Sequence, residues 1–183
     1  PETVYVSNPA DEDDVRAAFA GFDGPVVVKP NSTTRGVGVT KVHDADSLAG
    51  VTDYLDLVHD YRATGDKSYL VQEYLPDAAD YRVMVLDGEV VGAVRREAPE
   101  GWKHNVHRGA DATGVDLPAE LRKLAVDAAD TLGVAWLGVD VLVSGDRAVV
   151  NETNARPTID DETKYQAGFY DRLAALVERT AEQ

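Results

Sequence analysis

Apolar and polar residues alternate along the first part of the chain in patterns that predict strands and helices in turn. A valine-rich apolar run predicts a buried strand at 25–30, alternation predicts a strand at 37–42, and a further strand is predicted at 68–75. Acidic residues followed by an amphipathic pattern predict two helices, at about 11–20 and 44–62. Residues 1–10 are expected to be turn-like.

The second part of the chain shows the same mixture of patterns. Asp87-Gly88 is a strong turn signal and predicts a hairpin of the two strands that flank it, at 81–86 and 89–96. Residues 97–116 form a long polar stretch, and a loop of that length in a compact domain is usually functional or mobile. Helices are predicted at 118–132 and 160–180.

A chain of 183 residues can form one large domain or two smaller lobes with a real core. The natural boundary lies near Pro76, so we expect an α+β fold made of two lobes, 1–75 and 76–183. No apolar run approaches the ~20 residues that cross a bilayer. No charged-then-apolar leader opens the sequence, so we expect a cytoplasmic protein with no membrane partner.

The most informative stretch is a predicted β-hairpin at 138–154. Folding the chain back about residue 146 sets Asp140 opposite Glu152, and Asn154 shares a strand face with Glu152. Mg²⁺ prefers oxygen ligands, usually one or two carboxylates completed by substrate phosphates. We therefore predict a metal–nucleotide site at Asp140, Glu152 and Asn154. The alternative is a pair of solvated surface carboxylates, which the surrounding valines disfavour.

Composition limits the classes of partner. The formal net charge is −15, with 22 Asp and 11 Glu against 12 Arg and only 6 Lys. This balance is similar to that of proteins from salt-loving archaea, in which high salt screens self-repulsion; an ordinary acidic cytosolic protein is the alternative. The acidity argues against general nucleic-acid binding. The absence of cysteine excludes disulfides and thiolate zinc sites.

Basic residues gather in one part of this acidic chain, which favours an anion site there. The cluster comprises Arg95, Arg96, Lys103, His104, His107 and Arg108. His104 and His107 could instead bind zinc, but no cysteine or carboxylate lies near them in sequence.

Lys29 ends a predicted buried strand, where a lysine is costly unless it pairs with an anion or extends to solvent. A phosphate contact and a solvent-reaching side chain both fit this residue. The loop that follows, 32–38, offers hydroxyls and glycines to a phosphate, but it is no Walker A motif and a plain turn explains it as well. Gln72-Glu73-Tyr74 ends a strand near the lobe boundary, where it could contact adenine or simply link the lobes.

Taken together, these pieces resemble the ATP-grasp superfamily, and most closely its RimK-type branch, which ligates glutamate and related amino acids to an acceptor carboxylate. The resemblance holds in order and spacing over about residues 25–157. The matching runs are 25–29, 35–39, 71–74, Asp80-Tyr81-Arg82, 105–109, 138–140 and 151–154.

The resemblance implies a role for each matching residue. Lys29 matches the phosphate lysine, Glu73-Tyr74 the adenine-contacting hinge, and Asp80 a ribose contact. Lys103-His104-Asn105 falls in the loop that meets the nucleotide phosphates. The nucleotide-binding set is Lys29, Arg35, Gly36, Gln72, Glu73, Tyr74, Asp80, Lys103, His104 and Asn105, and the metal ligands are Asp140, Glu152 and Asn154.

The implied reaction is ATP-dependent amide ligation, with the nucleotide between the two lobes. The acceptor carboxylate attacks the γ-phosphate, and the amine of an amino acid such as glutamate then displaces phosphate from the acyl phosphate. Mg²⁺ or Mn²⁺ would bridge the β- and γ-phosphates, and Arg96 or Arg108 would stabilise the transferring group. The loops at 32–38 and 97–113 would close over the site.

Departures from the family pattern bear on the acceptor more than on the nucleotide. Ser32-Thr33-Thr34 stands where the family often has more glycine, and Ala155-Arg156-Pro157-Thr158 replaces small residues that lead to Pro-Gly. Family members carry a further N-terminal domain, so we expect this chain to be the ATP-grasp portion of a longer enzyme. A non-catalytic Mg-ATP-binding module is the rival hypothesis. The acceptor (a protein tail, a carrier protein or a coenzyme) and the oligomeric state stay open, and a homo-oligomer is compatible with the sequence.

Overall fold

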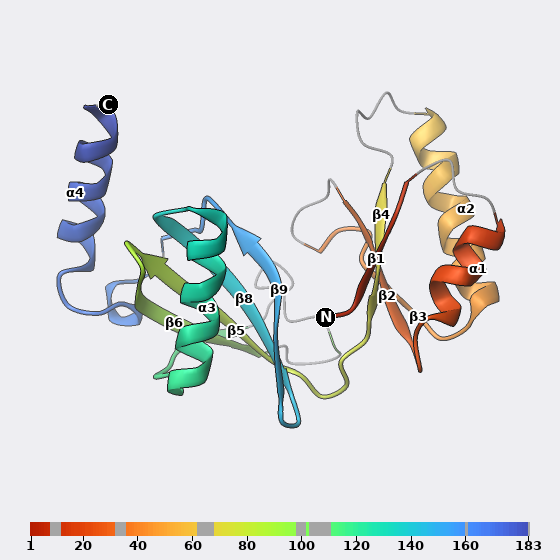
Figure 1. Ribbon diagram of the computed structural model, residues 1–183, viewed down its shortest axis with the longest axis horizontal. Coiled ribbons are helices and arrows are strands. Elements are labelled where there is room, and N and C mark those ends of the chain that lie inside the picture. The colour runs from red at the N-terminus through yellow and green to blue at the C-terminus, as the bar shows by residue number, and fades with distance from the viewer. Residues whose placement is uncertain are drawn as a thin grey trace. The chain divides into compact units, whose positions relative to one another are not determined.

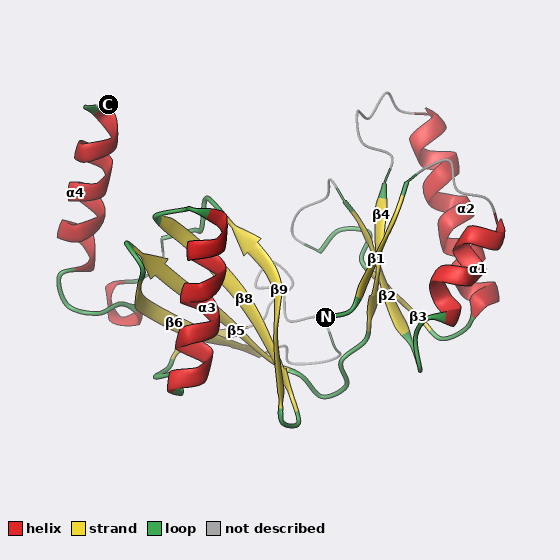
Figure 2. Ribbon diagram, in the orientation of Figure 1, coloured by secondary structure: helices red, strands yellow, loops and turns green. Residues whose placement is uncertain are grey.

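The protein is described by a computed structural model covering residues 1–7, 12–31, 36–61, 68–97, 102, 111–159 and 161–182. The chain divides into two compact units, Pro1–Pro76 and Asp77–Gln183, and the division lies one residue from the predicted boundary. Each unit is built on its own antiparallel sheet, and the secondary structure of both is shown in Figures 1 and 2.

The first unit is a four-stranded sheet with two helices on one face (Figure 1). The sheet order is β1 (Thr3–Val6), β4 (Tyr69–Glu73), β2 (Val26–Pro30) and β3 (Thr40–Val42). Helices α1 (Glu12–Ala20) and α2 (Ala45–Tyr61) bury Val15, Leu48 and Leu55 against Val26, Val28 and Val71 of the sheet. Strand residues alternate between faces, so Lys29 and Gln72 lie on the face opposite these helices.

Two predictions for the first unit are wrong in detail. Residues 3–6 form a strand where a turn-like segment was expected, because Thr3-Val4-Tyr5-Val6 is a β-branched and aromatic run that pairs with β4. The strand predicted at 37–42 is limited to Thr40–Val42, because Gly36 and Gly38 adopt positive φ and residues 36–38 form a turn. Helix α2 begins after Asp44, whose carboxylate accepts the Ser47 amide at 2.7 Å.

The second unit is a five-stranded antiparallel sheet. Its order is β7 (Asp111–Gly114), β6 (Glu89–Glu97), β5 (Ala79–Leu86), β8 (Trp136–Ser144) and β9 (Arg147–Asn154). Helix α3 (Ala119–Leu132) packs on one face, with Leu121 and Ala125 against Val83, Val139 and Val141 (Figure 2). Strand β7 is a correction, because it lies inside the stretch predicted as a loop at 97–116.

The other face of this sheet is apolar at one end and polar at the other. Met84, Leu86 and Val94 pack with Phe169, the first residue of α4 (Phe169–Ala181). Asp80, Arg82 and Asp140 alternate in register with this apolar set and therefore share its face. The polar end of this face carries the candidate site.

The last helix starts later than predicted. Residues 160–168 were expected to be helical, but Glu162–Lys164 form a short 3₁₀ helix (η2). Asp161 caps η2 by accepting the Thr163 amide at 2.9 Å, and the hydrogen bonds from Thr163 lower the pKa of this carboxyl. The Gln166 amide then bonds the Val91 carbonyl at 2.8 Å, so this segment runs along the edge of β6 before α4 begins.

None of the helices in the described part of the chain combines the length and apolar character that a membrane crossing requires.

Candidate metal and nucleotide site

The predicted pairing of the 138–154 hairpin is confirmed. Strands β8 and β9 place Asp140 opposite Glu152 and Gly138 opposite Asn154. The register shifts directly after Asp140, so that Val141 pairs with Val150. Asp140, Glu152 and Asn154 therefore lie on one face of two neighbouring strands.

A network of charged side chains adjoins this set on the same face. Arg82 of β5 donates two parallel hydrogen bonds to Asp140, from Nε to Oδ1 at 2.7 Å and from Nη2 to Oδ2 at 2.8 Å. Arg96 of β6 donates to Asp80 at 2.6 Å and forms an ion pair with Asp140 at 3.0 Å, both through Nη2. Two arginines and two aspartates thus alternate across β6, β5 and β8.

Burial distinguishes the members of the network. The side chains of Asp140 and Arg96 are 5% and 8% exposed, whereas that of Arg82 is 21% exposed. Burial alone would lower the pKa of Arg96, but the carboxylates of Asp140 and Asp80 outweigh it and raise the pKa above the ordinary value. Arg96 is consequently a fixed, permanently charged partner of two carboxylates.

The oxygen set fits a hard divalent cation in donor chemistry. Asp140, Glu152 and Asn154 supply two carboxylates and one amide from adjacent strands, which suits Mg²⁺ when phosphates complete its shell. Asn154 Oδ1 accepts the Arg156 amide at 2.9 Å, which orients that oxygen and leaves it a second lone pair. Within the described ranges, no group of three or more His, Cys, Asp or Glu side chains could bind a metal, so the amide oxygen is needed for a three-ligand site.

Gly138 positions the segment that follows Asn154. A Cβ atom at Gly138 would lie 2.9 Å from Cβ of Pro157, so only glycine lets this buried proline pack against β8. The backbone after the predicted ligand Asn154 is thereby held against the strand that carries Asp140.

One member of the predicted basic cluster faces away from this site. Arg95 pairs in register with Tyr81 and therefore points to the opposite face from Arg96, where it contacts Glu97 at 3.0 Å. Arg95 and Arg96 are neighbours on the strand predicted at 89–96, so strand alternation puts them on opposite faces and explains the correction.

The first unit places two predicted nucleotide-binding residues, Lys29 and Gln72, on one sheet face. Lys29 is half-buried beside Leu70, and Gln72 is paired with Val27 two residues along β2. Gln72 is only 6% exposed; its Nε2 donates to Thr3 Oγ1 at 2.9 Å, and its Oε1 has no hydrogen-bond partner among the described residues. A buried amide oxygen without a partner is costly, which is consistent with a ligand contact there.

The backbone amides of the predicted hinge, Glu73 and Tyr74, already form hydrogen bonds within the first unit. The Glu73 amide bonds the Glu2 carbonyl at 3.0 Å, and the Tyr74 amide bonds the Pro25 carbonyl at 3.1 Å. Glu73 Oε1 also accepts the Glu2 amide at 2.6 Å. These two backbone amides are thus used within the sheet, and an adenine contact here would depend on other groups.

Two residues were given no role from the sequence. Arg82 was quoted as part of the run at 80–82, but the strand pairing alone reveals its contact with Asp140. Lys41 places its ammonium 4.2 Å from the Tyr74 ring centroid and is the register partner of Val27, on the same face as Gln72. Alternation within the predicted strand at 37–42 could have placed Lys41 on that face.

The remaining predicted residues are only partly covered by the structure. Gly36 lies in the turn at 36–38. Arg35, Lys103, His104, Asn105, His107 and Arg108 lie outside the described residues.

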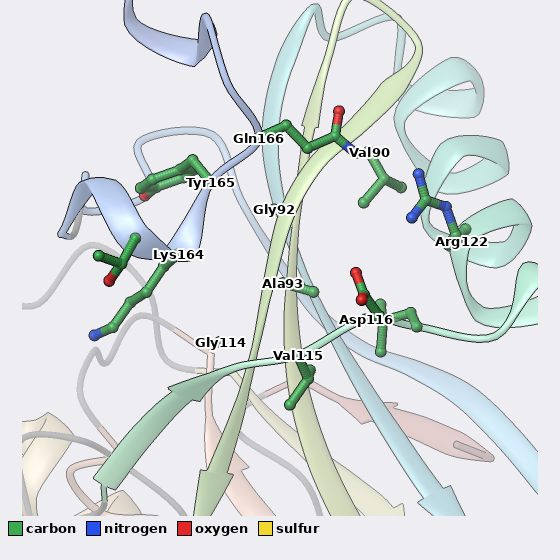
Figure 3. A pocket seen from close by; sticks show the side chains of 12 residues that line it. Val90, Gly92, Ala93, Gly114, Val115, Asp116, Arg122, Lys164, Tyr165 and Gln166 are labelled. Atoms are coloured by element: carbon green, nitrogen blue, oxygen red, sulfur yellow. The ribbon is translucent and has the colours of Figure 1, made fainter.

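A separate cavity of about 400 Å³ lies in the second unit and does not coincide with this site (Figure 3). Its walls are formed by Val90, Gly92 and Ala93 of β6, residues 114–117, Arg122 of α3 and residues 163–166. None of the predicted site residues contributes to it.

Comparison with known proteins supports one family throughout. The model of the RimK-like ATP-grasp domain matches residues 1–169. A protein of Hydrogenovibrio crunogenus named "Probable alpha-L-glutamate ligase" is 34% identical over 185 residues, covering 99% of this chain and 58% of the relative. A protein of Pseudoalteromonas atlantica named "Probable alpha-L-glutamate ligase 2" is 36% identical over 163 residues, covering 87% of this chain and 51% of the relative. The chain thus spans little more than half the length of these curated relatives.

Solved structures show the same fold at lower identity. D-cycloserine synthetase DcsG superposes with a TM-score of 0.74 at 19% identity, over 97% of this chain and 64% of its own. The ATP-grasp ligase PsnB, in a complex with minimal precursor, Mg and ADP, superposes with a TM-score of 0.63 at 22% identity, over 94% of this chain and 48% of its own. At these identities the likeness is one of fold.

Proposed function

Since the chain belongs to the RimK-like ATP-grasp family, whose members are ATP-dependent ligases that form amide bonds, we propose that it is the ATP- and metal-binding part of a carboxylate–amine ligase. The amino acid added is glutamate or a close relative, as in the curated relatives' names. The acceptor is a carboxylate on a protein tail, a carrier protein or a coenzyme.

One observation carries the proposal beyond family membership. Strand pairing sets Asp140, Glu152 and Asn154 on one face, next to a guanidinium pair that is already balanced by carboxylates. Oxygen ligands with arginines beside them are what a metal–triphosphate ligand needs, because the metal and the guanidinium groups both neutralise phosphate charge. Mg²⁺ or Mn²⁺, when bound, would supply charge neutralisation at the β- and γ-phosphates.

The other residues act by binding and orienting the nucleotide. Lys29 contacts phosphate, and the buried Oε1 of Gln72 accepts a hydrogen bond from the ligand. Asp80 contacts the ribose while Arg96 holds it in place. Glu73 and Tyr74 contact adenine through groups other than their backbone amides.

The reaction is a two-step ligation. The acceptor carboxylate oxygen attacks the γ-phosphorus and ADP leaves, and then the amine nitrogen attacks the acyl carbon, loses a proton and displaces phosphate. Charge stabilisation and in-line positioning suffice for both steps, without a protein nucleophile. We assign the stabilising charge to Arg96, acting from the network, and to Arg108.

The test is nucleotide-dependent stabilisation of the folded chain, followed by thermal unfolding in about 1 M KCl, where surface charge is screened. Mg-ATP at about 100 times its Kd should add about 2.7 kcal/mol to the free energy of unfolding. ATP with EDTA should add much less. Equal stabilisation with and without Mg²⁺ would contradict the metal assignment.

A non-catalytic Mg-ATP-binding module is the second candidate, because Asp140, Glu152 and Asn154 could bind Mg-ATP whether or not ligation follows. ADP release separates the two. A ligase releases ADP only when glutamate and an acceptor are both supplied, whereas a binding module shows Mg-ATP stabilisation and no such release with any acceptor tested.

A further inference from the structure

We infer that Arg82 is an internal counter-cation of Asp140 that weakens binding of a free divalent cation, so that tight metal binding requires nucleotide phosphates. The inference rests on the proposed function, because it takes Asp140 as a metal ligand. It makes Arg82 a positioning residue whose effect on the metal passes through Asp140.

The contact between the two side chains is unusually complete. Arg82 and Asp140 are register partners on β5 and β8, and both carboxylate oxygens receive an Arg82 donor, at 2.7 and 2.8 Å. Such paired bonds fix a carboxylate in plane and in direction. The orientation of the Asp140 carboxylate is therefore set by Arg82.

The acceptor capacity of Asp140 is nearly filled. A carboxylate has about four lone-pair sites, two on each oxygen. Among the described residues, Oδ2 faces both Arg82 at 2.8 Å and Arg96 at 3.0 Å, whereas Oδ1 faces Arg82 alone at 2.7 Å. Oδ1 thus keeps one acceptor site, which allows one bond to a metal but disfavours a bidentate one.

Strand order places Arg82 and Glu152 on opposite sides of Asp140. The sheet runs β6, β5, β8, β9, so Arg82 approaches from β5 while Glu152 stands opposite Asp140 on β9. A cation bound by Asp140 and Glu152 would therefore share Asp140 with Arg82. Sharing one carboxylate lowers its attraction for either cation.

Charge balance gives the direction of the effect. Arg82 and Arg96 neutralise Asp80 and Asp140, so within the part of the chain that the structure describes, Glu152 is the member of this five-residue set whose charge is not balanced by another member. A site with one net negative charge binds a dication only weakly in water. A cation that arrives with a triphosphate brings negative charge, and Arg82, the more exposed arginine at 21% against 8%, can then contact that charge.

Binding of Mn²⁺ as a probe, measured by the electron spin resonance signal of unbound Mn²⁺ with and without ADP, tests the inference. In the wild-type chain, ADP should strengthen Mn²⁺ binding by about tenfold or more, as expected for one charge acting at short range. Arg82→Met should strengthen Mn²⁺ binding in the absence of ADP by about the same factor and shrink the gain from ADP.

Two matched variants isolate the cause. Arg95→Met removes the same charge from the opposite face of the sheet, where the side chain is 47% exposed, and should change Mn²⁺ affinity by less than about twofold. The double variant Arg82→Met/Asp140→Asn should not show the tighter Mn²⁺ binding expected of Arg82→Met, because the carboxylate that Arg82 releases is gone. A gain that survives in the double variant, or an unchanged or weakened Mn²⁺ affinity in Arg82→Met, would overturn the inference.

Thermal unfolding tests the inference even if Arg82→Met is too unstable for a binding titration. Arg82→Met leaves Asp140 poorly compensated, so it should be destabilised in EDTA and should gain more from Mn²⁺ than the wild type gains. If the variant is unfolded in EDTA, Mn²⁺ should restore its fold. A Mn²⁺ response no larger than that of the wild type would reduce Arg82 to a structural ion pair and overturn the inference.

The outcomes also separate this inference from the proposed function. If the wild-type chain binds Mn²⁺ neither alone nor with ADP, both fail. If it binds Mn²⁺ with ADP and Arg82→Met leaves the Mn²⁺ affinity without ADP unchanged, only the role of Arg82 fails.

Discussion

Two carboxylates that face each other across β8 and β9 have opposite surroundings. Asp140 is buried between two guanidinium groups, whereas Glu152 is exposed on the outer strand. Both belong to the proposed metal site, but only Asp140 also contributes to the fold. Substitutions at the two positions should therefore have different effects on the free energy of unfolding but the same effect on the response to metal.

Asp140→Ala should lower the free energy of unfolding by about 3–5 kcal/mol, because it removes the buried carboxylate that both Arg82 and Arg96 contact and leaves Arg96 with Asp80 alone among the described residues. Glu152→Ala should stay within about 0.5 kcal/mol of the wild type, as exposed sites usually do. Urea unfolding in EDTA measures both. Equal losses in the two variants would show that the ion pairs of Asp140 make no net contribution to the free energy of unfolding.

Glu152→Ala is therefore the cleaner probe of the metal, because its fold is expected to be intact. It should remove the Mg²⁺-dependent part of the stabilisation by ATP, and Glu152→Gln should remove most of it. Glu89→Ala, at an exposed carboxylate of β6 that contacts Arg172, serves as a control that should leave the response unchanged. A full Mg²⁺ response in Glu152→Ala would remove Glu152 from the ligand set.

Lys29 distinguishes a phosphate contact from a solvent-reaching side chain. It is half-buried on the same face as Gln72, away from the helices of its sheet. Lys29→Ala should weaken ATP binding by about tenfold to a hundredfold, the range for a lost hydrogen bond to a charged group. Lys123→Ala on α3, which removes an exposed lysine paired with Asp127, should leave the affinity unchanged in the same calorimetric titration. Unchanged affinity in Lys29→Ala would favour the solvent-reaching role.

Among the elements, the segment before α4 depends on one glycine. A Cβ atom at Gly92 would lie 2.5 Å from the Lys164 carbonyl oxygen and 2.9 Å from the Tyr165 ring, and Tyr165 stacks on Phe169 at 4.0 Å between centroids. Gly92→Ala should therefore push this segment off β6 and cost about 1–3 kcal/mol, as overpacking does.

Gly50→Ala provides the matched control, because a Cβ atom there meets nothing within 4 Å and the residue lies inside α2. It should be neutral or stabilising by up to about 1 kcal/mol, since alanine is the better helix former. Urea unfolding compares the two variants, and fluorescence of Trp136, which packs beside Phe169 at 5.4 Å, reports the displaced segment. A neutral Gly92→Ala would show that the segment can shift freely.

The elements also show which patterns were sufficient for prediction. The pairing of Asp140 with Glu152 in the hairpin at 138–154 could be predicted because the turn is short and clear, although residues 141–150 pair one residue away from the register that folding about residue 146 gives. The start of α4 could not, because the pattern at 160–168 is helix-like and the deciding contacts, Gln166 with Val91 and Tyr165 with Gly92, join segments far apart in sequence. β7 and β1 were missed for the same reason, since each is short and defined by its partner strand.

At the level of the molecule, sequence could supply the ligand types but not their environment. Asp140, Glu152 and Asn154 could be grouped from spacing alone. That Arg82 and Arg96 both contact Asp140 depends on the order of strands β6, β5 and β8, which no local pattern encodes, whereas the separation of Arg95 from Asp140 follows from strand alternation. The site's charge balance is therefore a property of the folded sheet.

The surface charge of the whole chain leads to a prediction about salt. A net charge of −15 on 183 residues destabilises the folded state by self-repulsion, and salt shortens the range of that repulsion from about 10 Å at 0.1 M to about 3 Å at 1 M. The thermal midpoint of unfolding should therefore rise steadily between these KCl concentrations. NaCl should act equally if screening is the cause.

Asp13→Lys/Asp53→Lys, which reverses two exposed acidic residues of α1 and α2, should raise the midpoint at 0.1 M and flatten its rise with KCl. The paired arginines and aspartates of the buried network are screened less than surface charges, so they should not reverse this trend. A midpoint that stays level or falls as KCl increases would show that the acidic surface does not limit stability and would favour an ordinary acidic protein over a halophilic one.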